Sequence, residues 1–401
     1  MEPAIRETLD VVFRWVHLIA GIMWVGNSLL FNWLDRNLVR REGAPERHVG
    51  EVWLLHSGGF YEVEKKFLGP TEMPKVLHWF KWQAYTTWLT GACLLGIVYY
   101  SSGGDTMLDP SVSRIGPGPA VALGAGSIVG GWMLYELLWR SPLARFDAVA
   151  TALSLAVLSA DVWLVTHVLS GRAAFIHVGA MLGTCMAGNV FFHIVPSQRA
   201  LVASTLAGRP RAEDERLSNL AKRRSIHNNY MTFPLLFTMV SNHFGSVYGN
   251  PYNWALLAVV FVGGASARHV LNVRFSFRRW VPALAAAISV TVGLLVLVLA
   301  RAGRAAAVAA PHGPPVSFAA ARAVLSERCV PCHSANPTIV SNPLPPPNVR
   351  FDTAEEIRQF ASRIETRAVV SRSMPLANKT QMTDDERNLL GRWFAAGAPT
   401  E

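Results

Sequence analysis

The sequence predicts an all-α protein in which a bundle of eight membrane-spanning helices is followed by a small soluble helical domain. Of the 401 residues, 51% are hydrophobic and only 16% are charged, whereas a soluble domain carries roughly 25% charged residues. Long apolar runs recur through residues 1–301, and from about Ser317 the composition becomes that of a soluble domain. The first part is therefore expected in lipid and the second in water.

A helix needs about 20 residues to cross about 30 Å of hydrocarbon. The first run, from Val11 to Trp33, is too long for the core of a signal peptide and has no basic patch before it, so we interpret it as a span. Short connections predict that the third, fourth and fifth spans are antiparallel neighbours. The eight predicted spans are residues 10–34, 79–101, 117–140, 146–170, 172–196, 228–248, 252–273 and 279–301.

The distribution of positive charge predicts the orientation. The loops after the first and the fifth span each hold seven Arg or Lys residues, whereas the loops on the opposite side hold Arg114 and Arg172. By the positive-inside rule the basic loops are cytoplasmic, and both ends of the chain lie outside. The net charge of +10 is thus a signal of topology, and we expect no nucleic acid as a partner.

The soluble part begins after residues 302–316, AGRAAAVAAPHGPPV, which lack apolar periodicity and predict a semi-rigid linker. In residues 317–401 we expect a helix over FAAARAVLSERC, a second over TAEEIRQFASRIETRAV and a last over TDDERNLLGRWFAAG. Thr383 and Glu386 form the pattern of a capping box at the start of the last helix.

The first of these helices leads into ERCVPCHS, which contains a Cys-x-x-Cys-His motif. The thiols of Cys329 and Cys332 can each add to a vinyl group of haem, and His333 is placed to ligate the iron. No second pair of ligands accompanies the motif, which argues against a zinc site. The sequence therefore predicts one covalent haem.

The whole tail resembles a small class I cytochrome c, a family in which a methionine after the second helix supplies the other axial ligand. Here SRSMPLANKTQM offers Met374 and Met382, and Met374 matches better because Pro375 follows it directly. A thioether ligand raises the haem potential, which suits a domain that accepts electrons and passes them on. The resemblance implies a haem c whose iron is held by His333 and Met374.

Eight histidines fall in or at the ends of the predicted spans, where ionisable groups favour functional roles. Two layers of histidine would suit one or two b-type haems, each iron taking imidazoles from facing helices. The predicted topology places His17, His167, His177 and His243 towards the outer face, and His78, His193, His227 and His269 towards the inner face.

In antiparallel neighbours, His177 would face His243 and His193 would face His227. On one helix His177 and His193 are sixteen residues apart, and on the other His227 and His243 are separated by the same interval. This spacing places the two histidines of each helix on nearly opposite faces, so the same two helices do not readily serve both haems. For each histidine a hydrogen-bonded role remains the alternative. Asn27, Glu136, Asp161 and Asn189 are further polar residues in spans, and Asp161 is a candidate for a proton path.

The loop after the first span contains EVWLLHSGGFYEVEKK, which is too polar to cross a membrane. A basic, aromatic-rich surface would suit a flat anionic heterocycle; an amphipathic segment lying on the membrane is the alternative. Together with WVHLIAGIMWVGNSLLFNWLD in the first span, this stretch resembles the bacterial membrane-bound urate hydroxylases that are fused to a C-terminal cytochrome c. The resemblance covers essentially the whole chain.

That resemblance implies oxidation of urate to 5-hydroxyisourate, with water supplying the oxygen and electrons passing through haem to the respiratory chain without release of hydrogen peroxide. It also implies a bacterial inner-membrane protein whose N-terminus and cytochrome c domain are periplasmic. The expected partners are urate, membrane lipid, and a soluble c-type cytochrome or a terminal oxidase as the electron acceptor.

Urate oxidation needs a base and cationic or amide groups that hold the anion. The candidates near the inner face are His56, Glu64, Lys65, Lys66, Asn228 and Arg268. Two other functions remain open: a non-catalytic b/c-type cytochrome that relays electrons, and a quinol:cytochrome c oxidoreductase. The large cytoplasmic loops favour the enzyme, because a protein that only relays electrons needs no large cytoplasmic loops.

Overall fold

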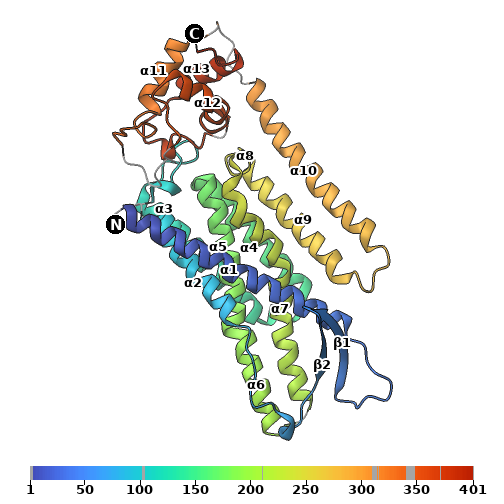
Figure 1. Cartoon of the computed structure of the whole chain (residues 1–401). Coiled ribbons are helices and arrows are strands. Elements are labelled where there is room, and N and C mark those ends of the chain that lie inside the picture. The colour runs from blue at the N-terminus through green and yellow to red at the C-terminus, as the bar shows by residue number, and fades with distance from the viewer. Residues whose placement is uncertain are drawn as a thin grey trace.

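The computed structural model describes residues 3–101, 104–209, 211–308, 314, 316–339, 348–370 and 372–400. In Figure 1 a bundle of long helices has the C-terminal domain, with α11, α12 and α13, at one end and the hairpin of β1 and β2 towards the other. The described residues are thus mostly helical, as predicted. We call the end next to the C-terminal domain the outer end.

The bundle is formed by long helices with several short ones between them. α2 continues without a break into a π-helical turn, Gly96–Tyr100, and α5 continues through the π-helical turn Val190–Ile194 into α6. The elements are α1 (Pro3–Asn37), α2 (Trp82–Leu95), α3 (Pro117–Arg140), α4 (Asp147–Val168), α5 (Gly171–Asn189), α6 (Val195–Leu206), α7 (Arg211–Val240), α8 (Gly245–Tyr248), α9 (Asn253–Val273) and α10 (Trp280–Val308).

Six helices in the described part of the chain are long and apolar enough to cross a membrane: α1, α3, α4, the continuous helix Gly171–Leu206, α9 and α10. The apolar window of α10 is 0% buried within the protein, whereas that of Gly171–Leu206 is 61% buried. A helix with so many exposed apolar side chains is stable in lipid but not in water. In lipid it also satisfies its own backbone N–H and C=O groups through its internal hydrogen bonds. The chain is therefore a membrane protein with α5 at its centre.

Two predicted spans differ from the observed helices. The segment 79–101 forms α2 and its π-helical extension, and neither meets the length and hydropathy of a span. The segment 228–248 is broken, because α7 starts earlier and ends at Val240, where a turn (Ser241–His243) and α8 follow. Good helix formers extend α7 at its polar start, and Ser, Asn and Gly residues interrupt it at the outer end. The count of eight spans remains a prediction.

An antiparallel hairpin of β1 (His48–His56) and β2 (Gly59–Lys66) corrects the all-α prediction. The turn residues Ser57 and Gly58 both have positive φ, as a two-residue hairpin turn requires. The alternation of apolar and polar residues in this loop was visible in the sequence, and alternation is the signature of a strand.

Small residues let α5 approach its neighbours closely. A Cβ atom at Gly179 would lie 2.2 Å from Oγ1 of Thr238 on α7, and one at Gly188 would lie 2.5 Å from Nε1 of Trp132 on α3. In lipid, helices associate through such close packing and not through the hydrophobic effect. The glycines of α5 therefore set the spacing of the bundle.

The C-terminal domain contains α11 (Phe318–Arg328), α12 (Ala354–Ile364) and α13 (Asp384–Ala395) around a core that includes Leu325 and Trp393. The three predicted helices and the predicted capping box of Thr383 and Glu386 are confirmed. α10 continues to Val308, so the start of the predicted linker is helical. Residues 309–313 and 315 of that linker, and most of the predicted loop PLPPPNV, lie outside the described residues.

We expect Gly179→Ala to lower the free energy of unfolding by about 1–3 kcal/mol, because the added methyl group overlaps Thr238. Gly183→Ala is the matched control one turn along α5, where the nearest atom is Cδ1 of Leu235 at 3.8 Å and alanine improves helix propensity. Thermal unfolding in detergent measures both. Equal melting temperatures for the two variants would contradict the packing described here.

Candidate functional site

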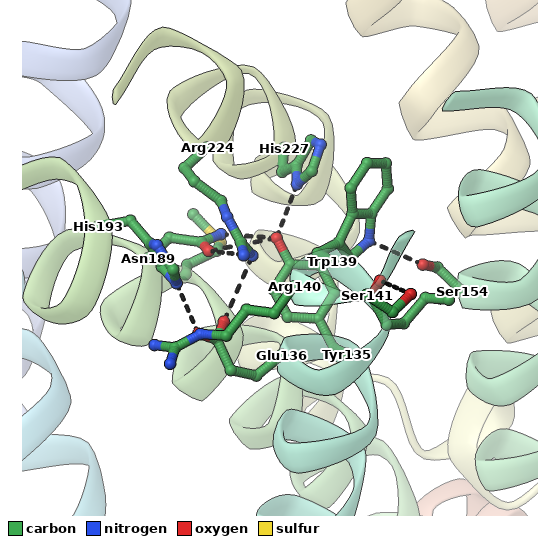
Figure 2. A network of polar contacts seen from close by, with 12 residues as sticks. Tyr135, Glu136, Trp139, Arg140, Ser141, Ser154, Asn189, His193, Arg224 and His227 are labelled. Atoms are coloured by element: carbon green, nitrogen blue, oxygen red, sulfur yellow. Dashed lines mark hydrogen bonds and ion pairs between the residues drawn. The ribbon is translucent and has the colours of Figure 1, made fainter. Parts of the chain in front are cut away.

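A network of polar side chains lies where α3, α5 and α7 meet (Figure 2). Arg224 on α7 is 3% exposed, and its Nη1 donates to Oδ1 of Asn189 at 3.2 Å and lies 3.4 Å from Oε2 of Glu136. Nε2 of His193 lies 2.6 Å from Oε1 of the same carboxylate. Glu136 is thus held between an arginine and a histidine.

A second set of hydrogen bonds extends the network towards α7. Nδ2 of Asn189 donates to the hydroxyl of Tyr135 at 2.9 Å, and that hydroxyl lies 2.7 Å from Nδ1 of His227. Nδ2 of Asn189 also lies 2.8 Å from Oδ1 of Asn228, whose own amide donates to the carbonyl of Met186. The buried polar groups satisfy one another, as buried networks must.

Such a cluster inside a span is costly, which makes it a candidate functional element. The linked carboxylate, imidazoles and phenol can pass protons between the helices. Arg224 shares the carboxylate of Glu136 with Arg140, so one negative charge faces two guanidinium groups. The network brings together the predicted residues His193, His227 and Asn228. Sequence reasoning missed Arg224, which it counted among the basic loop residues that set the topology.

The other predicted histidines are separated from one another. Both ring nitrogens of His177 are engaged, Nε2 with the hydroxyl of Tyr100 at 3.0 Å and Nδ1 with the carbonyl of Ala173 at 2.8 Å. A Cβ at Gly124 would lie 2.6 Å from Nε2, so this side of the ring is filled. In this arrangement His177 does not fit as a haem ligand.

Four more histidines lie on the surface of the described chain: His78, His167, His243 and His269. His17 is half-buried, with Nδ1 bound to the carbonyl of Thr87. Among the described residues, no hydrogen bond or ring contact joins any two of the eight histidines, and no group of three or more His, Cys, Asp or Glu residues could hold a metal ion. The members of the predicted pairs His177/His243 and His193/His227 thus make no direct contact, and ligation of b-type haem stays a prediction.

The hairpin candidates are engaged in local ion pairs. Glu64 binds Nζ of Lys66 and Nδ1 of His48, both at 2.9 Å, and these two bonds lower the pKa of Glu64. Lys65 lies on the opposite face of the strand and binds Asp35 of α1 at 2.6 Å. His56 lies exposed at the hairpin turn. The positive charge expected in this loop is therefore largely neutralised.

A hollow at the base of the hairpin is acidic, since four glutamates accompany Arg41 and His48 in its lining: Glu42, Glu51, Glu62 and Glu64. Such a lining repels an anion. Arg268 is buried elsewhere, on α9, with Nε donating to Oδ1 of Asn229 at 2.7 Å. The six predicted catalytic residues are not assembled into one site.

The residues of the Cys-x-x-Cys-His motif suit covalent haem. Cys329 and Cys332 are free thiols at the end of α11. Nδ1 of His333 bonds to the carbonyl of Val349 at 3.0 Å, which leaves the lone pair of Nε2 for a metal. Met382 is 3% exposed and packed in the core of the domain, whereas Met374 is half-buried in a loop, which favours Met374 as the second ligand.

Two arginines brace this domain. Arg387 is buried and donates from Nη1 to the carbonyl of Met374 at 2.8 Å, which fixes the loop. Arg328, next to Cys329, binds Glu386 of α13 at 2.8 Å. Burial alone would raise the pKa of Glu386, but the bonds from Arg328 and from the backbone of Thr383 outweigh it and lower that pKa.

Comparison with protein families gives a match to the family model described as "Urate oxidase N-terminal", over residues 3–300. Comparison with curated proteins and with solved structures gives no match. The matched residues include the whole polar network and end before α11.

We expect Arg224→Met to lower the free energy of unfolding by about 3 kcal/mol, because it leaves Glu136 with a buried charge that Arg140 and His193 compensate only in part. Arg216→Met, on the same helix, removes an exposed pair with Glu213 and should cost less than about 1 kcal/mol. Thermal unfolding in detergent distinguishes them. Similar losses for both variants would show that the Arg224 pair is not buried.

The C-terminal domain should lose stability as the pH falls through the lowered pKa of Glu386. The carboxylate stabilises the folded state fully above its unfolded pKa of about 4.3, and the contribution disappears on protonation. Hydrogen exchange of the α11 and α13 peptides, corrected for intrinsic rates, measures this. Glu386→Gln should lose about 1 kcal/mol of protection at neutral pH and flatten the acid dependence, whereas Glu355→Gln, at an exposed position, should change neither. A wild-type pH profile retained in Glu386→Gln would refute the assignment.

Proposed function

Because the chain belongs to the urate oxidase N-terminal family, we propose that it is a membrane-bound oxidoreductase that oxidises urate and passes the electrons to a haem c in its C-terminal domain. Urate and water give 5-hydroxyisourate, two protons and two electrons. The electrons leave one at a time for a soluble c-type cytochrome or a terminal oxidase, so no hydrogen peroxide forms. The protein lies in the bacterial inner membrane with both ends on the periplasmic side.

The observation that supports this proposal is that one chain joins the family domain to a haem-attachment motif and packs the two against each other. The turn Leu376–Asn378, just after Met374, contacts the turn Asp105–Met107 at the outer end of the bundle. An oxidase that does not pass its electrons to molecular oxygen needs another electron acceptor close to the domain that binds the substrate. The C-terminal domain is held in such a position.

The side chains have distinct tasks in this proposal. Cys329 and Cys332 hold the haem covalently, and His333 and Met374 ligate its iron. The haem supplies a one-electron acceptor whose potential the thioether raises. Arg387 keeps the Met374 loop in place through its carbonyl. The Glu136 network provides groups that take up or pass on protons within the bundle.

Anaerobic addition of urate to the purified, oxidised protein tests the proposal. We expect the c-type absorption bands to rise and to reach completion with about half an equivalent of urate per haem, because urate gives two electrons and a haem accepts one. Cys329→Ser/Cys332→Ser should abolish the bands, whereas Cys93→Ser, outside the motif, should leave them unchanged.

Reduction by dithionite but not by urate would refute the enzyme and favour an electron relay. Reduction by quinol but not by urate would favour a quinol oxidoreductase. A simultaneous rise of b-type bands would show that some of the eight histidines bind haem.

A further inference from the structure

One face of the β-hairpin is apolar near the turn and acidic at its other end. Trp53, Leu55 and Phe60 are 59%, 68% and 79% exposed. They share this face, because Leu55 pairs with Phe60 across the strands and Trp53 lies two residues before Leu55. We call these three residues the apolar tip. The acidic hollow described above lies at the base of the same face. Exposed apolar clusters of this kind mark interaction surfaces.

The protein supplies no layer that covers the apolar tip, since all three side chains are more than half exposed within the described chain. The contacts that hold the hairpin to α1 lie nearer its base. Glu51 pairs with Val39 through two backbone hydrogen bonds, and Lys65 binds Asp35. A two-stranded hairpin is marginally stable in water unless one face packs against another layer. The layer over the apolar tip must therefore come from outside the chain.

The apolar tip points back towards the membrane. The chain leaves α1 after Asn37, and Val39 pairs antiparallel with Glu51, so β1 runs opposite to the departing chain. β2 then runs away again, because Pro70, shortly after its end, lies next to Gly208 beyond the inner end of α6. In Figure 1 the hairpin accordingly lies beside the inner end of α1. The tip is thus the membrane side of the hairpin, and the acidic base is the water side.

The strands are long enough to reach the lipid headgroups. Asp35 holds Lys65 near the inner end of α1 at 2.6 Å. Phe60 lies five residues earlier in β2, which corresponds to about 17 Å of strand. The headgroup region of one leaflet is only about 5–8 Å thick. Open strand edges are not stable in hydrocarbon, so the backbone of the tip ends among the headgroups and only its side chains extend further.

The surface around the inner end of α1 has the composition of a membrane interface. Phe31 of α1 and Phe80, just before α2, are exposed and contact each other, with ring centroids 5.1 Å apart. Trp82 is also exposed, and Nζ of Lys81 lies 5.4 Å from the centroid of its ring. Aromatic rings next to basic side chains are typical of the headgroup level of membrane proteins. The apolar tip therefore continues a surface that already faces lipid.

Unpaired positive charge lies at the same end of the bundle. Arg36, in the last turn of α1, and Arg40, just after it, are exposed and form no ion pair with another described residue. Arg41, Lys65 and Lys66 are instead paired with carboxylates. Free cations next to a span are attracted to anionic headgroups.

We propose that the hairpin is a membrane anchor whose apolar tip inserts among the lipid headgroups at the inner end of the bundle, while its acidic base stays in water. The lipid surface supplies the layer that the two-stranded sheet lacks. The pair of Lys65 and Asp35 fixes the hairpin against α1 at the correct height. This role is independent of the substrate and of any cofactor.

Fluorescent labelling of the full-length protein in nanodiscs of zwitterionic and anionic phospholipids tests the proposal. Leu55→Cys places an environment-sensitive fluorophore at the apolar tip, and Glu42→Cys places the same label in the exposed loop at the base. Wild-type protein, labelled identically, gives the background from its own cysteines. We expect the label at position 55 to emit at shorter wavelength, to be quenched by lipids that carry a nitroxide near the headgroup, and to be shielded from aqueous acrylamide. The label at position 42 should be quenched by acrylamide and not by the lipid.

Substitutions on the two faces of the hairpin give the matched comparison. Trp53→Ser/Phe60→Ser should lower the lipid quenching at position 55 to the level at position 42, because the tip loses its apolar side chains. Tyr61→Ser, on the opposite face, should leave it unchanged. Equal lipid quenching at positions 55 and 42 in the otherwise unchanged protein would overturn the inference. A label at position 55 that neither lipid nor acrylamide quenches would also overturn it, because a protein surface would then cover the tip.

Discussion

The close packing of α5 against α3 and α7 is the constraint on which the other features depend. Glycines on α5 meet Thr238 and Trp132 with no room for a side chain, so the three helices share one spacing. The same spacing lets Glu136, Asn189 and Arg224, one from each helix, reach one another inside the bundle. Without that approach the guanidinium of Arg224 would be buried without a carboxylate partner, and Glu136 would keep only its pair with Arg140 on the same helix.

A single helix connects the two polar regions of the molecule. Its first residues, Ser170 and Gly171, line a small cavity under the C-terminal domain, and Asn189 and His193 lie in the buried network. Glu136 meets two arginines and a histidine in the network, and the cavity is lined by three arginines and one aspartate, so both regions carry more positive than negative side chains.

The fusion of the two domains has a physical explanation in this arrangement. The lining of the cavity comes from both domains, and the loop that supplies the proposed iron ligand forms part of it. Arg387 fixes that loop from inside the C-terminal domain, and the turn Leu376–Asn378 fixes it against the bundle. A separately diffusing domain would have to form these contacts at each encounter.

The sequence alone was sufficient for what depends on local pattern. Apolar runs identified all six of the helices in the described part of the chain that can span a membrane, and Thr383 and Glu386 placed the start of the last helix of the C-terminal domain. It missed the hairpin, because the stretch was expected to form either a surface for a flat anionic heterocycle or an amphipathic segment on the membrane. The pairing of Arg224 with Glu136, the two hydrogen bonds of His177 and the cavity lined by Arg172 and Arg367 depended on the tertiary structure. Periodicity reports which face of a helix is apolar, but which polar groups meet depends on how helices far apart in sequence rotate and pack.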